Sequence, residues 1–493
     1  MRNEVQLIAY ADRLGGDIPG VARLLHEQLP GVFGGVHLLP FFTPYDGVDA
    51  GFDPVDHTTV DPRLGTWQDV RDLGAQHDTV VDLIVNHVSA DSAPFQDVIR
   101  RGSASPWASL FLTYGSVFPD GATEADLTAI YRPRPGLPFT PMALGGERHL
   151  VWTTFTPSQV DIDVTSAAGE AYLVSILDTL AAADVTLLRM DAVGYAVKTP
   201  GSTCFMTPQT FAFIDRFTGL ARDRGLDVLV EVHSYYRRQI EIGATVDRVY
   251  DFALPPLVLH AAYTGDHAPL ARWLSIRPTN AVTVLDTHDG IGVIDVGPDQ
   301  TTPDQPGLLT PAELDALVET IHERTGGQSR AATGWAASNL DVYQVNSTFY
   351  DALGGDPRTY LAARAVQFFT PGVPQVYYVG ALAGRNDMEL LARTGVGRDI
   401  NRHHYTAEEV TAALDEPVVV ALCALARFRN TLGAFDGAFA MAERGTGLVL
   451  TWTCPDRSAS LEVDLAGGAA SITWQVDGRS HRTDDLLTDP PRI

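Results

Sequence analysis

Eight apolar segments of strand length alternate along most of this chain with stretches of helical patterning. A typical intervening stretch is GEAYLVSILDTLAAAD, residues 169–184. Strand–helix alternation repeated eight times predicts an α/β fold, specifically a (β/α)8 TIM barrel. The eight segments are QLIAYAD, GGVHLLPF, TVVDLIVNH, VTLLRMD, DVLVEVH, RVYDFALP, AVTVLDTHD and GVPQVYYVG.

Two connections between predicted strands are too long for a simple barrel. About a hundred residues separate the third and fourth segments and about eighty separate the seventh and eighth, and structureless loops of that length are uncommon in compact domains. We therefore expect two inserted subdomains over the C-terminal face of the barrel. After about Phe435 short alternating segments predict a small C-terminal β-domain. The predicted division is a barrel made of residues 1–85, 166–290 and 355–434, inserted subdomains over 86–165 and 291–354, and the β-domain over 435–493.

Charge and composition exclude several classes of function. A net charge of −26 argues against a nucleic-acid or anionic-membrane partner. Lys198 is the single lysine and no GxxxxGK motif occurs, so a phosphate-binding loop of the kinase type is excluded. Three cysteines without a CxxC pair are typical of a reducing compartment. The first residues, MRNEVQLIAYADRLGG, contain no apolar signal core, and we expect a soluble cytoplasmic protein.

Four of the segments end in carboxylates and histidines. They are DLIVNH, LLRMDAVGY, LVEVHS and VLDTHDG, in that order along the chain. The C-terminal ends of barrel strands open into the active site, so Asp191, Glu231 and Asp289 are predicted to converge from three different strands. Cleavage of a glycosidic bond requires a pair of carboxyl groups, one to attack or stabilise C1 and one to protonate the leaving oxygen. The pattern therefore predicts a glycoside-active enzyme.

The surroundings of two of these carboxyl groups suggest different roles. Arg189 and Asp191 stand two positions apart on one strand and share a face, so the guanidinium is expected to keep Asp191 ionised as a nucleophile. Glu231 follows the apolar run DVLV, and apolar surroundings favour the protonated carboxyl form that a general acid needs.

The third carboxylate and the histidines fit a binding role. Asp289, beside His288, is expected to hold sugar hydroxyls and support an oxocarbenium-like transition state, and His87 to do similar binding work. A single Asp at a strand end more often caps a helix. The joint occurrence of four such segments on one barrel pattern favours catalysis over a purely structural explanation.

The four segments resemble, in type and order, the characteristic regions of the α-amylase superfamily (glycoside hydrolase family 13). The chain is more similar still to the sucrose phosphorylase subgroup of that superfamily, and this resemblance spans nearly the whole sequence. It is carried by QLIAYADRLGG, LPFFTPYDGVDAGFDPVDHT, GSVFPDGATEADL, IYRPRPGLPFT, RMDAVGYAVKTPGSTCFMTP, EVHSYYRRQ, VYDFALPPL, LDTHDGIGVID, AASNLDVYQVNSTFYDALG, GVPQVYYVGALAGRNDMELL and GRDINRH.

What the resemblance implies is a retaining double displacement on sucrose. Asp191 would attack C1 of the glucosyl unit while Glu231 protonates the fructosyl oxygen, and fructose would leave. Glu231 would then deprotonate inorganic phosphate, which attacks the β-glucosyl ester to give α-glucose 1-phosphate. Asp289 would stabilise the transition states. The resemblance also suggests a homodimer and no cofactor or metal, and the His403–His404 pair lacks metal-motif spacing.

The resemblance also assigns binding roles around the sugar. Glucosyl hydroxyls would be bound by His87, Arg189 and His288, the far edge of the ring by Asp49 and Arg398, and an apolar wall would be formed by Phe52 and Tyr195. Leu340, Asp341 and Gln344 would face fructose, with His233 and Tyr131 lining the same acceptor space.

Phosphate needs its own binding groups, because a phosphorylase must favour millimolar phosphate over water as the acceptor. Arg134, flanked by prolines in RPRPG, is the candidate because arginine pairs with phosphate in a bidentate manner, and Tyr343 is expected to join it. We expect the loop around Tyr343 to rearrange between the two half-reactions.

Three other interpretations remain open. A sister phosphorylase would act on sucrose 6'-phosphate, glucosylglycerol or glucosylglycerate, although the neutral Tyr343 and Gln344 favour plain fructose as the leaving group. A hydrolase or transglucosidase would not need Arg134. A catalytically inactive barrel used for binding or assembly is argued against by the intact set Asp191, Glu231 and Asp289.

Overall fold

The computed structural model describes residues 1–132, 136–299, 302, 304–333 and 344–493, and in this part of the chain the predicted barrel is present. Eight strands, each parallel to both neighbours, form a closed barrel in the order β1-β2-β5-β10-β11-β12-β13-β16. The fold class predicted from the alternation is therefore confirmed. The strands are β1 Gln6–Ala9, β2 Gly35–Leu38, β5 Asp78–Ile84, β10 Leu187–Asp191, β11 Asp227–Val230, β12 Arg248–Asp251, β13 Ala281–Thr283 and β16 Val373–Tyr377.

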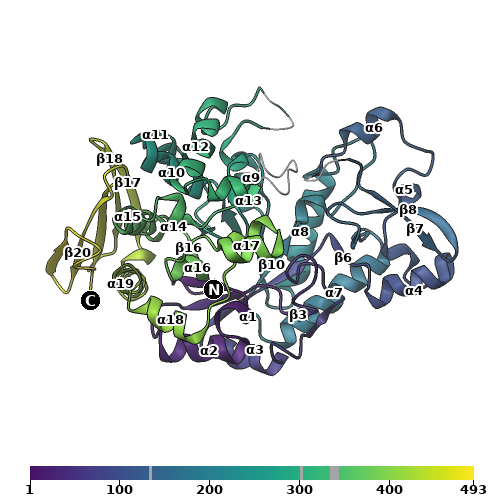
Figure 1. The fold of residues 1–493 in the computed structure, drawn as a ribbon, viewed down its shortest axis with the longest axis horizontal. Coiled ribbons are helices and arrows are strands. Elements are labelled where there is room, and N and C mark those ends of the chain that lie inside the picture. The colour runs from purple at the N-terminus through teal and green to yellow at the C-terminus, as the bar shows by residue number, and fades with distance from the viewer. Residues whose placement is uncertain (133–135, 300–301, 303, 334–343) are drawn as a thin grey trace.

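Helices surround the barrel, and Figure 1 shows them packed around its strands. Several begin with a polar cap followed by proline, as α8 does with Thr207, which accepts a hydrogen bond from Thr210 N, and with Pro208 at its first position. The outer helices are α2 Ile18–Glu27, α3 Trp67–Gly74, α7 Ala167–Ala182, α8 Pro208–Arg222, α9 Tyr236–Gly243, α10 Leu254–Thr264, α11 Ala268–Ile276, α15 Pro357–Phe369 and α19 Pro417–Thr431.

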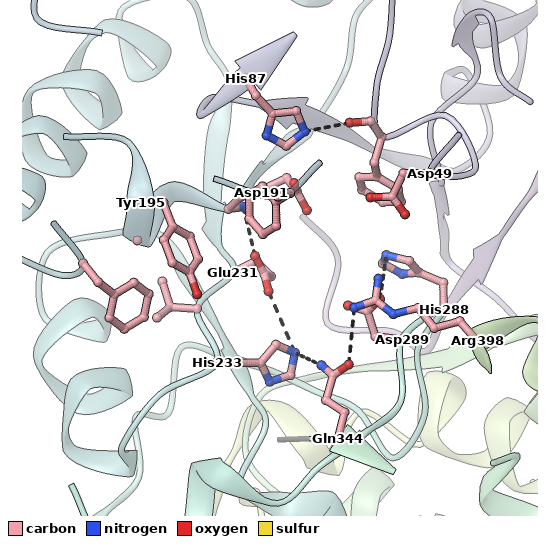
Figure 2. A pocket seen from close by; sticks show the side chains of 16 residues that line it. Asp49, His87, Asp191, Tyr195, Glu231, His233, His288, Asp289, Gln344 and Arg398 are labelled. Atoms are coloured by element: carbon pink, nitrogen blue, oxygen red, sulfur yellow. Dashed lines mark hydrogen bonds and ion pairs between the residues drawn. The ribbon is translucent and has the colours of Figure 1, made fainter. Parts of the chain in front are cut away.

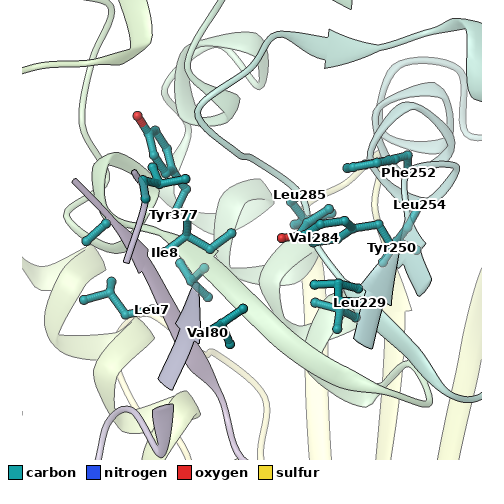
Figure 3. Close-up of a cluster of buried hydrophobic side chains, with 14 of the residues drawn as sticks. Leu7, Ile8, Val80, Leu229, Tyr250, Phe252, Leu254, Val284, Leu285 and Tyr377 are labelled. Carbon is teal, nitrogen blue, oxygen red and sulfur yellow. The ribbon is translucent and has the colours of Figure 1, made fainter. Parts of the chain in front are cut away.

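The core lies between the strands and these helices. Strands such as β2 and β16 are buried at every position because helices cover the sheet outside and side chains fill it inside. This is why the sequence shows continuous apolar runs here rather than strict alternation. Figure 3 shows part of the core, including Leu7, Val80, Leu229 and Val284 from four different regions of the chain.

The first long connection, between β5 and α7, forms a separate lobe to the right in Figure 1. A small apolar cluster of its own, centred on Phe118 and the fully buried Trp152, stabilises it. Its elements are β6 His87–Ser89, α4 Ala93–Arg101, η1 Gly102–Ala104, η2 Ala108–Leu110, α5 Tyr114–Val117, α6 Glu124–Ala129, β7 Phe139–Leu144, β8 Glu147–Trp152 and β9 Gln159–Asp161.

The second long connection, between β13 and β16, is mainly helical in the described residues. It contains β14 Ile291–Gly292, η4 Ile294–Val296, α12 Pro311–Arg324, α13 Gln328–Thr333, β15 Gln344–Val345 and α14 Phe349–Ala352. After β16 the chain forms α16 Tyr378–Ala381, α17 Met388–Thr394, η5 Gly397–Asn401 and α18 Ala407–Leu414 before α19.

The chain ends in an antiparallel sheet, coloured yellow in Figure 1. Burial alternates along β18 because one face packs against the barrel helices, and Trp452 Nε1 donates to the Phe369 carbonyl at the end of α15, 2.7 Å away. The strands are β17 Ala438–Arg444, β18 Gly447–Thr453, β19 Ser458–Asp464, β20 Ala469–Val476 and β21 Arg479–Thr483. None of the helices described here is long and apolar enough to cross a membrane.

The smaller elements complete the description. They are α1 Ala11–Leu14, β3 Phe42–Thr43, β4 Asp56–Val60, η3 Val193–Tyr195 and η6 Ala434–Asp436.

Candidate active site

A cavity opens where the C-terminal ends of the barrel strands meet the two inserted regions. It contains about 760 Å³ of empty space, including the part that is open to solvent. Figure 2 shows side chains from distant parts of the sequence pointing into it. The predicted residues that line it are Asp49, Phe52, His87, Asp191, Tyr195, Glu231, His233, His288, Asp289, Gln344 and Arg398.

Other predicted residues lie elsewhere. Arg134, Leu340, Asp341 and Tyr343 fall outside the described residues. Arg189 is not among the residues that line the cavity, because its side chain is buried beneath Asp191. Tyr131 is not among the residues that line the cavity, but its ring is parallel to that of Tyr195, with 6.3 Å between their centroids.

Arg189 and Asp191 form the ion pair that their spacing predicts, with 2.8 Å between Nη1 and Oδ1. Arg189 lowers the pKa of Asp191, as the spacing predicts, but it does not decide the net direction. Burial raises the pKa of Asp191 above its ordinary range, and the nearby Glu231 and Asp82 carboxylates add to this, although Arg189 opposes it. One reason is that the Arg189 guanidinium is shared, since Nη1 also binds Asp82.

A chain of buried polar side chains runs through the barrel interior below this pair. His37 Nε2 donates to Asp82 Oδ2 at 2.9 Å, and the Tyr250 hydroxyl lies 3.4 Å from His37 Nδ1. The chain continues from Tyr250 to Gln375, 3.2 Å away, and ends at Gln6. Arg189 and His37 bring the pKa of Asp82 down to about 2 despite its burial. This network fixes the orientation of Arg189 from below.

Glu231 is held next to the nucleophile candidate by the backbone. Its Oε2 accepts a hydrogen bond from the amide of Ala192, 3.0 Å away, and Ala192 directly follows Asp191. Ala192 has a φ of 53°, in the left-handed region that non-glycine residues seldom occupy. Such strain is concentrated at functional sites, where the surrounding structure holds the backbone in place. The turn after β10 therefore brings the two carboxyl groups of the predicted pair to the same point.

Asp289 contacts positive charge on the opposite side of the cavity. Arg398 Nη1 lies 2.8 Å from Asp289 Oδ1, and His288 and Arg402 are close by. Burial alone would raise the pKa of Asp289, but Arg398 and the neighbouring cationic groups hold it well below its ordinary range. Asp289 is consequently an anion near neutral pH.

Glu231, His233 and Asp289 present ligand atoms within 4.8 Å of one another, a spacing that a metal ion can bridge. The guanidinium of Arg398 already neutralises Asp289, and a second cation beside it would be repelled. These residues fit a sugar and its leaving group better than they fit a metal.

The glucose side of the cavity combines a ring face with neutral polar groups. The rings of Phe52 and His288 stack with 4.8 Å between centroids, and His87 Nε2 donates to the Phe52 carbonyl at 2.9 Å. Burial lowers the pKa of both His87 and His288, which keeps them neutral near pH 7. Asp49 accepts from Gln159 Nε2 at 3.2 Å. Neutral donors and acceptors around a flat apolar face suit a pyranose ring.

Two aromatic residues that the sequence analysis did not single out complete the wall. Phe205 lies with its ring centroid 4.7 Å from that of Tyr195, and Phe155 lies 5.3 Å from it at a steep angle. Both come from irregular segments, in which no periodicity distinguishes a wall residue from any other aromatic. The aromatic-rich composition around Phe155 was the only available signal.

Lys198 is a structural cation beneath the site. Its Nζ lies 2.7 Å from Asp161 Oδ2, donates to Asn86 Oδ1 at 2.8 Å and also binds the Tyr195 carbonyl. The side chains of Lys198 and Asp161 are 2 % and 0 % exposed. The single lysine of the chain thus joins the inserted lobe to two segments that line the cavity.

The fold and the three carboxylates at the strand ends are those of an α-amylase-type barrel. Residues 11–230 match the family model described as "Alpha amylase, catalytic domain", and residues 434–491 match "Sucrose phosphorylase, C-terminal".

Similar proteins of known name identify the family within the α-amylase-type barrels. The sucrose phosphorylase of Bifidobacterium adolescentis is 56 % identical over 100 % of both chains, and that of Agrobacterium vitis is 60 % identical over 96 % of this chain and 97 % of its own. A crystal structure of sucrose 6F-phosphate phosphorylase from Thermoanaerobacter thermosaccharolyticum is similar with a TM-score of 0.89, 37 % identity and 98 % coverage of each chain. The chain belongs to the sucrose phosphorylase family.

Proposed function

We propose that this chain is a retaining sucrose phosphorylase that converts sucrose and inorganic phosphate to α-glucose 1-phosphate and fructose. The observation that carries the proposal is the contact between Glu231 and the backbone next to Asp191, which sets two carboxyl groups of different environment side by side on the cavity floor. The likeness to curated sucrose phosphorylases over the full chain supports the choice of substrates.

In the first half-reaction Asp191 attacks C1 of the glucosyl unit and Glu231 gives its proton to the departing fructosyl oxygen. The raised pKa of Asp191 refers to the free site, where three carboxyl groups share one cavity. The proposed step requires Asp191 to be ionised and Glu231 to carry the proton when sucrose is bound. Asp289 carries a permanent negative charge that stabilises the oxocarbenium-like transition state.

Substrate binding follows from the groups around the cavity. Phe52 and Tyr195 provide the apolar faces, His87 and His288 neutral polar contacts, and Asp49 and Arg398 the far edge of the glucose ring. Arg189 acts on the sugar through Asp191, because its guanidinium lies below that carboxylate.

In the second half-reaction phosphate replaces fructose in the acceptor space. Arg134 and Tyr343 are the proposed phosphate ligands, and Leu340, Asp341, Gln344 and His233 the fructose contacts. Support comes from Gln344 and His233, which line the cavity within 3.2 Å of each other. Gln344 directly follows the predicted loop residues in the sequence.

The proposal also covers the domain boundaries, the oligomeric state and the cellular location of the protein. The barrel segments, the inserted subdomains and the C-terminal β-domain keep the boundaries predicted above, supported by the end of β5 at Ile84, the start of α7 at Ala167 and the start of β17 at Ala438. A homodimer and a cytoplasmic location are proposed from the family resemblance and from the composition.

The test is incubation of the purified protein with sucrose, with and without phosphate, and assay of glucose 1-phosphate, glucose and fructose. Phosphate-dependent glucose 1-phosphate, equimolar with fructose, is the expected result. Free glucose at the same rate with or without phosphate would identify a hydrolase instead. Turnover of sucrose 6'-phosphate in preference to sucrose would place the chain with the sister enzymes, and Asp191→Asn serves as the inactive control.

A further inference from the structure

A buried histidine–carboxylate pair lies behind the general acid candidate. His233 Nδ1 is 2.9 Å from Oδ2 of Asp295, a residue of η4 that is completely buried. The imidazole ring stacks on Phe252, with 3.9 Å between centroids and 17° between planes. The ring is therefore fixed in its plane as well as at one nitrogen.

The carboxylate of Asp295 is itself held by several donors. Its Oδ1 accepts from the Ser234 amide at 3.0 Å and from Gln239 Nε2 at 3.2 Å. The backbone makes room for the pair, because a Cβ at Gly292 would approach Asp295 Oδ2 to 2.6 Å and His233 Nδ1 to 3.1 Å. A carboxylate with no proton of its own to donate requires a proton on His233 Nδ1, and this directs Nε2 towards the cavity.

His233 Nε2 lies among the reacting groups. It is 3.8 Å from Glu231 Oε1 and 3.2 Å from the amide nitrogen Nε2 of Gln344. Both contacts are drawn as dashed lines in Figure 2. The charged groups around the imidazole are Glu231 at the end of its own strand, Asp295 on η4, Asp289 after β13, and Arg398 of η5, whose Nη2 lies 3.4 Å from Gln344 Oε1. Carboxylates therefore dominate the surroundings of His233.

The electrostatics follow from this arrangement. Burial lowers the pKa of His233, but Asp295, Glu231 and Asp289 outweigh it and the net direction is upward from 6.5. The protonated form of the imidazole is therefore favoured relative to that of a free histidine side chain. In this structure the Gln344 amide nitrogen faces Nε2 and the amide oxygen accepts from Arg398 Nη2, so a second proton on the imidazole requires the amide to turn and present its oxygen.

We propose that Asp295 is a positioning residue that keeps His233 cationic, so that His233 supplies positive charge to the phosphate that attacks the glucosyl-enzyme. This inference rests on the proposed function. In the glucosyl-enzyme Asp191 is an uncharged ester, but Glu231 has lost its proton to fructose and Asp289 remains an anion. An incoming phosphate anion therefore meets two carboxylates, and the imidazolium beside Glu231 offsets one of them.

Protons and bonds balance when phosphate attacks the glucosyl-enzyme. The phosphate O–H proton moves to Glu231, the phosphate oxygen forms its bond to C1, and the C1–O bond to Asp191 breaks with its electron pair returning to the carboxylate. His233 keeps both of its protons throughout. Its contribution is to binding and to stabilisation of charge, which neither water nor fructose needs to the same extent.

The experiment compares Asp295→Asn with the parent protein. An amide in place of the carboxylate retains the shape but removes the charge that keeps His233 protonated. At pH 6.5 the KM for phosphate is expected to rise at least fivefold, while hydrolysis of sucrose without phosphate changes by less than about twofold. Because phosphate itself titrates in this range, the KM for phosphate of Asp295→Asn is divided by that of the parent protein at each pH. This ratio is expected to fall towards one as the pH rises and His233 of the parent protein loses its proton.

Two further variants guard against misinterpretation. Gly292→Ala pushes against the same His–Asp contact from the other side and is expected to give the same pattern. Asp387→Asn removes a histidine–carboxylate pair away from the cavity, where His403 Nδ1 lies 2.6 Å from Asp387 Oδ2, and is expected to leave the KM for phosphate unchanged.

An Asp295→Asn protein that folds and has an unchanged KM for phosphate would overturn the inference. So would equal losses of phosphorolysis and hydrolysis, which a merely structural role predicts. If Asp295→Asn does not fold, Gly292→Ala decides between the same outcomes. A parent protein that forms no glucose 1-phosphate would overturn the proposed function itself, and this inference with it.

Discussion

Arg189 Nη1 lies 2.8 Å from Asp191 Oδ1, and the same nitrogen also binds Asp82 one strand away. The barrel register produces this arrangement, because Arg189 and Asp82 are direct partners on β10 and β5. One guanidinium therefore serves two carboxylates, of which the deeper one has a pKa of about 2 and the catalytic one a raised pKa. We expect the division of this positive charge to set the acid limit of the proposed reaction.

Replacing Asp82 by Asn is expected to extend activity to lower pH. The change removes a negative charge near Asp191 and leaves Arg189 to that carboxylate alone, and both effects lower the pKa of Asp191. Since Asp191 must be ionised to attack, the acid limb of kcat/KM for sucrose should move down by about one pH unit. The measurement is a pH profile from 4 to 8. A shift towards higher pH would contradict the shared-charge argument.

Replacing Arg398 by Met is expected to move the acid limb of activity to higher pH, opposite to the effect of Asp82→Asn. Arg398 is the main group that lowers the pKa of Asp289, so its removal raises that pKa towards the range of an ordinary carboxyl group. Asp289 then becomes protonated as the pH falls, and activity is lost at a higher pH than in the parent. Loss of a charge-stabilising contact should also reduce kcat/KM by about 10²-fold. Arg393→Met, in the neighbouring helix α17, is the matched control, and an unmoved acid limb would count against the assignment.

Lys198→Met is expected to destabilise the protein strongly. The substitution leaves Asp161 buried without its cation, a type of change that costs about 3–5 kcal/mol. Chemical denaturation followed by fluorescence measures the loss, and Lys198→Arg should recover part of it because the charge is retained. Since Lys198 also binds the Tyr195 carbonyl, the KM for sucrose should rise in the methionine variant. Unfolding at the parent's denaturant midpoint would show that Lys198 has no structural role.

Asp191→Ala is expected to abolish turnover of sucrose, with a loss of at least about 10⁴-fold in kcat. Azide fits the space left by the carboxylate, and in a retaining mechanism it would attack C1 from the same face. The expected product with a substrate that has a good leaving group is therefore β-glucosyl azide, identified by its NMR coupling constant. The α anomer would contradict the assignment of Asp191 as the nucleophile.

The arrangement of the fold could be predicted because each barrel strand has a local signature. Fully buried parallel strands are short continuous apolar runs, and here every one of the eight was recognised from such a run. The three candidate catalytic residues Asp191, Glu231 and Asp289 could also be predicted, because each follows a run of this kind. Asp49 and Phe52 lie in a loop and Arg398 lies in the short 3-10 helix η5, so no hydrophobic period marks them and only the family resemblance indicated them.

What the sequence alone determined is thus the barrel, its order of elements and the identity of the groups that converge at its C-terminal face. Tertiary structure decided how those groups share charge. The sharing of Arg189 with Asp82, the pairing of His233 with Asp295 and the burial of Lys198 beside Asp161 join residues that are 107, 62 and 37 positions apart. Ionisation depends on burial and on neighbours within a few ångströms, and both arise only when distant segments pack together. This is why the sequence predicted the candidate nucleophile and its arginine partner, but not the net direction in which burial and neighbouring carboxylates move its pKa.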